Sequence, residues 1–188
     1  MNNKDKILCE ALSLFSARGY DAVGVQEICE ACAITKPTLY HYYNSKHGVL
    51  DALLDLYYPP FLENVRRAAE YHRDLIMNLE GLANTFFRFA LDQPDFNRFA
   101  LTIAFAPLES EAHIAQRKHK QVLYKIIEEL FLSAIPEHGN LKNKEKQLTA
   151  SFVGLLQSYI GLYLGGAAAL NESVSRSLVK QFMYGIFS

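Results

Sequence analysis

Apolar side chains recur at intervals of three and four residues along most of this chain, which is the spacing of one face of an α-helix. The first such face covers residues 7–15, and later faces cover residues 75–89 and 123–130. We find no segment with the strict alternation of a half-buried strand. The pattern therefore predicts an all-α fold of about nine helices.

Glycine and proline mark where these helices are expected to end. Gly19 follows the first helix and tolerates the positive φ that closes many helices. A proline lacks the N–H that a continuing helix needs and clashes with the preceding turn. Further breaks are therefore expected at Pro59-Pro60, at Pro94, at Pro107 and over residues 136–140.

Residues 25–43 read as two short helices joined by a tight turn. In the first, over residues 25–32, Ile28 and Cys32 are expected to face inward. Ala33 and Ile34 then form the turn. Thr35 stands where an N-cap hydroxyl begins the next helix, so the arrangement is that of a helix-turn-helix.

The second of these helices carries side chains of two kinds. Pro37 falls in its first turn, where the missing N–H is not needed. The apolar positions at helical spacing can pack inward, and these are Leu39, Tyr42 and Tyr43. The outward positions are left to Lys36, Thr38, Tyr40 and His41. A cation, a hydroxyl, a phenol and an imidazole at a helix tip are groups that recognise base edges and phosphates.

Residues 5–50 resemble the DNA-binding domain of the tetracycline-repressor (TetR) family of bacterial transcriptional regulators. The matching sequence is ILCEALSLFSARGYDAVGVQEICEACAITKPTLYHYYNSK, with Leu39-Tyr40, Tyr43 and Ser45-Lys46 all in register. The resemblance implies a helix-turn-helix domain over residues 1–46 and a helical ligand-binding and dimerisation domain over residues 47–188. It implies a repressor that binds a palindromic double-stranded DNA operator as a homodimer and is released by a small, apolar effector.

The resemblance also assigns roles to single residues. Contact with base edges is expected from Gln26, Lys36, Pro37, Thr38 and His41. Contact with phosphates is expected from Tyr40 and Lys46, since a phenol and an ammonium can bind a phosphate oxygen without reading sequence. The family pattern leaves Tyr42 open between packing and backbone contact.

Three positions depart from the family pattern. Ala33 replaces the usual turn glycine, which costs roughly 1 kcal/mol if the residue must be left-handed. Gly24 stands where a hydroxyl usually caps the first helix of the motif, so one customary phosphate contact is missing. His47 stands where an acidic residue often follows the Ser-Lys pair, and this places a titratable group near the expected DNA backbone.

Composition narrows the class of protein. A net charge of -1 and a pI near 6.6 argue against a chain that coats nucleic acid with a uniformly basic surface. The N-terminus lacks the apolar core of a secretory signal, and three cysteines do not suggest a disulfide framework. A cytoplasmic location is expected.

Several residues invite other chemistry. Cys29-x-x-Cys32 with His41 and His47 resembles a zinc finger, but only eight residues separate Cys32 from His41. A redox pair is the other alternative, and buried packing is favoured over both, so no metal or cofactor is expected. His113 and His119 lie in a charged stretch and are expected to be solvated.

Residues 149–170 contain no charged side chain and are long enough to span a bilayer. Polar Gln157 and Ser158 and the lack of flanking basic clusters favour a soluble helix, which in the family packs with the last helix, about residues 173–187, in the dimer. Small residues let helices approach closely. The expected dimer interface consists of Gly154, Ser158, Gly161, Gly165 and Phe182. An unusually apolar monomer core is the alternative.

The effector pocket is expected among aromatic side chains, which could equally fill the core. They are Phe86, Phe89, Phe96, Phe99, Phe105, Tyr124, Tyr159 and Tyr163. The sequence indicates no acidic cluster for a cationic ligand and no arginine pair for an acid. Pro59-Pro60 is expected to end or kink its helix and to relay ligand binding to the DNA-binding domain.

Two other functions remain open. A helical enzyme is disfavoured because no nucleophile-base set, metal-ligand spacing or phosphate loop is apparent. A helical module that binds a small molecule or lipid, without binding an operator, is the second alternative.

Overall fold

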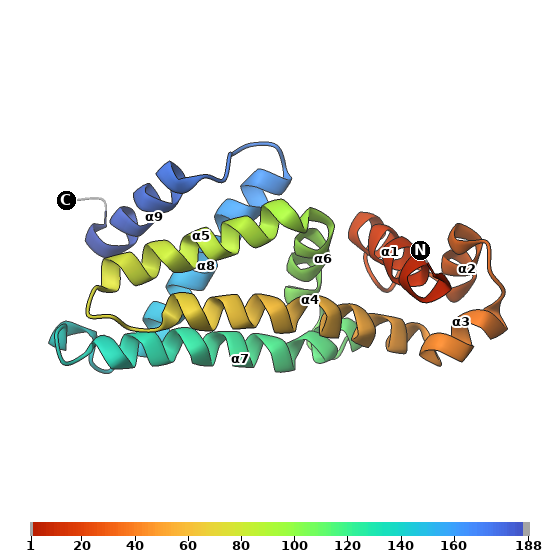
Figure 1. Cartoon of the computed structure of the whole chain (residues 1–188), viewed down its shortest axis with the longest axis horizontal. Helices are drawn as coiled ribbons and strands as arrows, with labels where there is room; N and C mark the ends of the chain where they lie inside the picture. Colours follow the sequence, from red (N-terminus) through yellow and green to blue (C-terminus); the bar gives the residue numbers. More distant parts are fainter. Residues whose placement is uncertain (1, 186–188) are drawn as a thin grey trace. The chain divides into compact units, whose positions relative to one another are not determined.

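The computed structural model describes residues 2–185, and over this range it contains nine α-helices and no strand. The all-α prediction and the predicted helix number are confirmed (Figure 1). A 3₁₀ turn, Gly139–Leu141, follows the seventh helix. In chain order the helices are α1 Asn3–Arg18, α2 Val25–Cys32, α3 Lys36–Tyr43, α4 Lys46–Ala69, α5 Leu75–Asp92, α6 Pro94–Ala104, α7 Glu111–Ala134, α8 Glu145–Leu164 and α9 Glu172–Tyr184.

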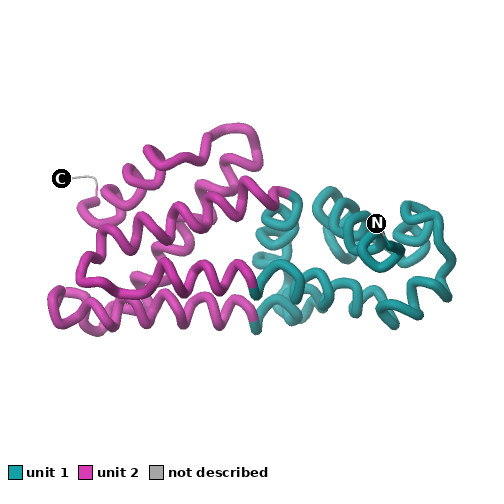
Figure 2. The backbone as a smooth tube through the Cα atoms, viewed as in Figure 1, with its two compact units in different colours: residues 1–59, 95–118 teal, residues 60–94, 119–188 magenta. Residues whose placement is uncertain are grey.

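The chain packs as two compact units, which Figure 2 distinguishes by colour. The first contains residues 1–59 and 95–118, and the second contains residues 60–94 and 119–188. Both α4 and α7 contribute to both units, since each of these helices extends across a unit boundary. The functional division expected at residues 46 and 47 stays a prediction.

Each unit has its own apolar core. In the first, Phe15 is fully buried and contacts the Tyr20 ring at 5.2 Å and the Phe99 ring at 5.5 Å between centroids. In the second, Phe152 is fully buried and its ring centroid lies 5.0 Å from that of Phe182. Burying one such side chain contributes about 1.5–3 kcal/mol, so each cluster stabilises the unit that contains it.

Most of the predicted breaks are confirmed. α1 ends at Arg18 with Gly19 at φ 82°, α6 begins at Pro94, and α6 and α7 end before the later prolines. The break at Pro59-Pro60 is wrong, because α4 runs without interruption from Lys46 to Ala69.

Burial on both sides of the proline pair explains why α4 continues. An interior proline costs about 3 kcal/mol. Against this, α4 buries apolar side chains before and after the pair, each contributing about 1.5–3 kcal/mol. These buried residues are Val49, Leu50, Leu53, Leu54, Tyr58, Phe61, Leu62 and Val65.

Two tight junctions fix α3 between its neighbours. At its start, Ala33 adopts the left-handed conformation, with φ 53° and ψ 45°, and its N–H donates to the carbonyl of Glu30. At its end, α4 approaches so closely that a Cβ on Gly48 would lie 1.8 Å from the carbonyl oxygen of Tyr43. Thr35 caps the helix by accepting from the backbone N–H of Thr38, as predicted.

Ala33→Gly is expected to raise the free energy of unfolding by about 0.5–1 kcal/mol. Glycine adopts the left-handed conformation without a steric penalty, and this gain exceeds the loss from the greater conformational entropy of glycine in the unfolded chain. Ala31→Gly, two residues earlier and inside α2, is the matched control and should lower it by about 1 kcal/mol. Urea unfolding of both variants measures the difference. Equal destabilisation by the two changes would contradict a strained turn.

Gly48→Ala is expected to destabilise the protein by at least about 2 kcal/mol, because the added methyl group meets backbone that cannot rotate away. Gly139→Ala is the control, since a Cβ there meets no atom within 4 Å. Thermal unfolding of both proteins tests the difference. A Gly48→Ala variant as stable as the wild type would show that the α3–α4 junction is looser than the structure indicates.

Candidate functional site

The outer face of α3 presents the groups that the sequence assigned to DNA contact. Lys36, Pro37, Tyr40 and His41 are exposed, and Thr38 is half-buried. The Thr38 hydroxyl lies 2.9 Å from the Thr35 hydroxyl at the N-cap. The first turn of α3 therefore offers a cation and polar groups beside unpaired backbone N–H groups, a combination that suits anions.

The inner face of α3 anchors the helix to α1. Leu39 and Tyr43 are buried, and the Tyr43 hydroxyl donates to the carbonyl of Lys4 at 2.9 Å. Burial raises the pKa of Tyr43 to about 12, so its hydroxyl remains a hydrogen-bond donor at neutral pH. These two contacts fix the rotation of α3 about its axis and thereby decide which side chains face outward.

Of the two roles left open for Tyr42, the structure does not show inward packing. Its side chain is 40 % exposed, and its ring centroid lies 5.3 Å from that of His41. Leu39 and Tyr43 form the buried side of α3, and Tyr42 lies outside it. Tyr42 therefore adds an aromatic surface to the outer face of α3.

Gln26 is exposed on α2, and its side-chain amide donates to the carboxylate of Glu30 at 2.8 Å. At the start of the same helix, Gly24 is the N-cap and donates its N–H to the Glu27 carboxylate. That hydrogen bond, followed by the hydrogen bond from Arg18, lowers the pKa of Glu27. The Glu27 carboxylate thus accepts the N–H of the N-cap residue, while no side chain at Gly24 caps the N–H groups of the first turn.

Lys46 supports the loop between α1 and α2. Its ammonium donates to the carbonyls of Tyr20 and Val23, each at 3.1 Å, and lies 4.1 Å above the centre of the Tyr20 ring. A phosphate would have to compete with these partners or share the ammonium with them. The phosphate contact stays a prediction, and the structure adds a loop-stabilising role that sequence reasoning missed.

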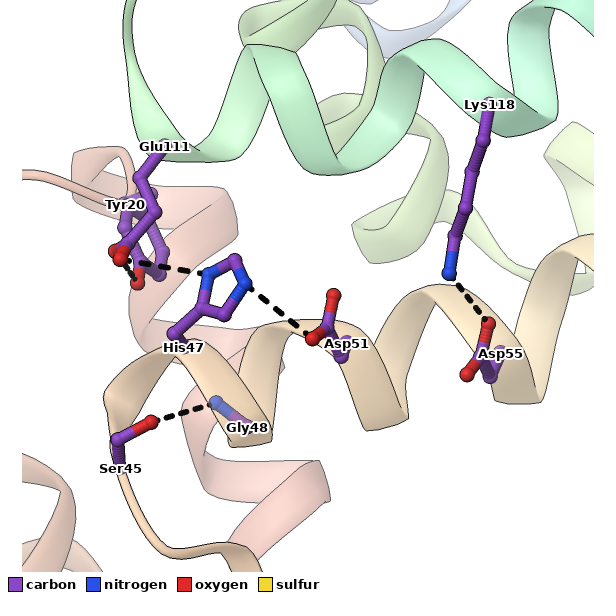
Figure 3. Close-up of polar contacts among 8 residues, drawn as sticks. All are labelled: Tyr20, Ser45, His47, Gly48, Asp51, Asp55, Glu111 and Lys118. Carbon is purple, nitrogen blue, oxygen red and sulfur yellow. Dashed lines mark hydrogen bonds and ion pairs between the residues drawn. The ribbon is translucent and has the colours of Figure 1, made fainter.

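At the start of α4, the His47 side chain lies between the carboxylates of Asp51 and Glu111 (Figure 3). Its Nε2 is 3.3 Å from Asp51, and its Nδ1 is 3.4 Å from Glu111 at the first residue of α7. The Tyr20 hydroxyl donates to the same Glu111 carboxylate, and burial and this hydrogen bond raise the pKa of Tyr20. Glu111 therefore joins the α1–α2 loop to the first turn of α4.

Further contacts join α4 to α6 and α7 within the first unit. The Gln116 side chain donates to the Tyr58 hydroxyl at 2.7 Å and to the carbonyl of Ala100 at 2.9 Å. Lys118 pairs with Asp55 at 3.4 Å, as Figure 3 also shows. Because only two residues separate the end of α3 from the start of α4, a shift of α4 would also move α3.

The cysteine pair is buried in packing. Cys29 and Cys32 are nearly inaccessible, and burial raises the pKa of both thiols, so neither is an activated thiolate. Among residues 2–185 no cluster of histidine, cysteine and carboxylate side chains could hold a metal ion.

The two histidines expected to be solvated are partly enclosed. His119 is buried on α7, which corrects that expectation. His113 is half-buried, with its Nδ1 3.2 Å from the carbonyl of Ile103. The charged residues around them in sequence fall on the outer face of α7, which is why local composition misled the prediction.

The aromatic residues proposed for an effector pocket are dispersed. Phe96 and Phe99 belong to the first unit, where Phe96 stacks on Tyr57 at 4.4 Å and Phe99 packs against Phe15. Phe105 is 80 % exposed and therefore lines no enclosed cavity. The remaining members belong to the second unit, where Phe86 is buried and the others are half-buried: Phe89, Tyr124, Tyr159 and Tyr163.

Open clefts on the second unit offer binding space instead. One of about 360 Å³ lies beside Phe87 and the start of α9, and one of about 420 Å³ lies between the ends of α4 and α7. A third, of about 520 Å³, includes Phe89 together with Arg67 and Arg88. The sequence did not indicate an arginine pair, because Arg67 and Arg88 line one cleft only when α4 and α5 pack.

The small-residue stripe on α8 is largely uncovered in the single chain. Ser158, Gly161 and Gly165 are exposed and Gly154 is half-buried, with open space where a Cβ of Gly154 or Gly161 would lie. Phe182 is half-buried against Phe152 of its own chain. The predicted end of the last helix at Phe187 lies outside the described residues.

No helix within residues 2–185 has the length and apolar character needed to cross a membrane.

Comparison with known proteins places the helix-turn-helix in a family. Residues 7–53 match the model of the bacterial regulatory proteins of the tetR family. The biofilm-operon negative transcriptional regulator IcaR of Staphylococcus epidermidis is 26 % identical over 145 residues, which cover 76 % of this chain and 75 % of IcaR. The transcriptional regulator YuxN of Bacillus subtilis is 42 % identical over 59 residues, which cover 31 % of this chain and only 20 % of YuxN.

A solved structure extends the likeness to the whole fold. The TetR-family transcriptional regulator PfmR of Thermus thermophilus superposes with a TM-score of 0.78 at 20 % identity, covering 100 % of this chain and 99 % of PfmR. The family model thus covers the helix-turn-helix, the match to IcaR extends over most of the chain, and the fold shared with PfmR includes the remaining helices. The tetR family model matches residues 7–53 of this chain, and the likeness to PfmR shows that the two proteins share a fold.

Proposed function

We propose that this chain is a ligand-responsive repressor that binds a palindromic operator as a homodimer in the cytoplasm and is released by a small molecule. The observation that carries the proposal is that α3 has one buried face and one exposed polar face. Its inner face buries Leu39 and Tyr43 and is tied to α1 by the Tyr43 hydroxyl, and its outer face exposes Lys36, Tyr40 and His41. A rigidly held helix with exposed polar groups at its N-terminal end suits entry into the major groove.

Homodimer formation is supported by the face of α8. Gly161 and Gly165 are exposed beside Leu162, which is 50 % exposed. An apolar, small-residue face with no charge suits close packing against the same face of a second copy. Two recognition helices related by a twofold axis would read the two halves of a palindrome.

A response to ligand is supported by the two helices that contribute to both compact units. The clefts described above belong to the second unit and α3 belongs to the first, while α4 and α7 contribute to both. A ligand that favours one position of α4 would therefore change the population of the DNA-binding conformation.

Selection of bound sequences from random duplex DNA is expected to enrich a palindrome. Lys36→Ala combined with Thr38→Ala should weaken binding to it by at least about 30-fold, since each base contact contributes about 1–3 kcal/mol. Lys125→Ala removes the same charge from α7, outside the helix-turn-helix, and should leave operator affinity nearly unchanged. Thermal unfolding must show that the double variant remains folded.

Enrichment that survives in the double variant would contradict the role of α3. A folded dimer that selects no sequence would instead favour a ligand-binding module without an operator.

Gly161→Leu is expected to weaken the dimer while the subunit stays folded. The new side chain projects into open space in the single chain, and leucine favours the helix over glycine by about 1 kcal/mol. In a dimer the same side chain would force the facing helices apart. Sedimentation analysis should show more monomer than in the wild type and in the control Gln121→Leu, which adds a leucine to the exposed face of α7. An unchanged dimer would place the interface elsewhere.

A further inference from the structure

The cleft between α4 and α5 combines an apolar floor with two cations. Phe61 and Phe89 stack at 4.3 Å between ring centroids with an interplanar angle of 16°. Phe61 is buried and also meets the edge of Phe86, while Phe89 is only half-buried. The cleft therefore offers an aromatic surface that water covers when no ligand is bound.

The two arginine side chains lie on the two helices that form the cleft. Arg67 projects from α4 and Arg88 from α5, and both line the cleft. Arg67 is engaged through Nε with Glu63 at 3.2 Å. Among the described residues Arg88 forms no ion pair, although Asp92 lines the same cleft one turn later. The lining thus carries two guanidinium groups and the Asp92 carboxylate, and of the two arginines only Arg67 is already paired, with Glu63.

The walls are held in place before any ligand arrives. The side-chain amide of Asn78 donates to the carbonyls of Ala68 and Glu70 at 2.9 and 2.8 Å and ties α5 to the end of α4. Near this end, a Cβ on Gly81 would lie 3.9 Å from the Cβ of Ala68, so the two helices are close there. A preformed cleft loses less ordering entropy on binding.

We propose that this cleft binds an organic carboxylate with an apolar body. The body would lie on Phe89 and Phe61, and the carboxylate would accept hydrogen bonds from Arg88 and Arg67, whose planar groups suit a carboxylate. A volume of about 520 Å³ suits a small molecule. That such a ligand releases the operator rests on the function proposed above, because it would link α5 to α4.

Calorimetry on the whole protein without DNA tests the binding. The aromatic probes are 1-naphthoate and its neutral analogue 1-naphthalenemethanol, and the aliphatic probes are octanoate and octanol. At least one carboxylate is expected to bind about tenfold more tightly than its alcohol, because a hydrogen bond to a charged group contributes about that factor. Whether the naphthoate or the octanoate binds shows whether the apolar part of the ligand is a flat aromatic group or an alkyl chain.

Variants locate the site. Arg88→Gln is expected to weaken carboxylate binding about tenfold and to leave alcohol binding unchanged. Arg67→Gln should have the same direction of effect. Arg176→Gln is the matched control, since it removes an exposed, ion-paired arginine from α9 and should change neither. All three substitutions are at exposed positions, so thermal unfolding should show little loss of stability.

The proposal is overturned if neither carboxylate binds more tightly than about 1 mM, if the alcohols bind equally well, or if both arginine variants keep full affinity. The effector role is tested separately by adding the bound carboxylate to the protein–operator complex. Binding without release supports the cleft and contradicts the effector role. Failure to select any operator contradicts the proposed function and leaves the binding result standing.

Discussion

The proposed DNA-contact surface depends on one constraint: α3 is eight residues long and is too short to be stable alone. Its position is therefore set by what it buries and by how it is joined. Leu39 and Tyr43 supply the buried face, Ala33 supplies a left-handed turn before it, and Gly48 allows α4 to begin almost in contact with it. Any side chain exposed on α3 is oriented by these four positions.

The start of α4 has a second task, because it connects α3 to the helices that follow. Lys46 binds the carbonyls of the α1–α2 loop, and His47 lies between Asp51 and Glu111. The α3–α4 junction is thus fixed on one side by backbone and on the other by charged side chains. Backbone contacts give rigidity, whereas exposed charged contacts are weak enough to rearrange. This combination suits a helix-turn-helix whose position can be biased by a ligand.

The second unit leaves two surfaces with different chemistry. The α8 face is uncharged and made of small residues, so its complement is another apolar helix face. The α4–α5 cleft combines two arginines with the Phe61–Phe89 stack, so the complement proposed for it is an amphipathic anion. The proposed dimer face and the proposed ligand cleft use different residues, so the two proposed interactions would not compete for the same side chains.

The sequence by itself determined the helices, the helix-turn-helix, the left-handed strain at Ala33 and the inward side of Leu39 and Tyr43, because these follow from local spacing and capping. It failed at Pro59-Pro60, where local propensity predicted a break and burial along α4 outweighed it. Only the tertiary structure brought Glu111 to His47, Lys46 to the loop carbonyls, and Arg67 to Arg88. These partners lie on different elements of the chain, and no local pattern encodes which side chains meet when helices pack.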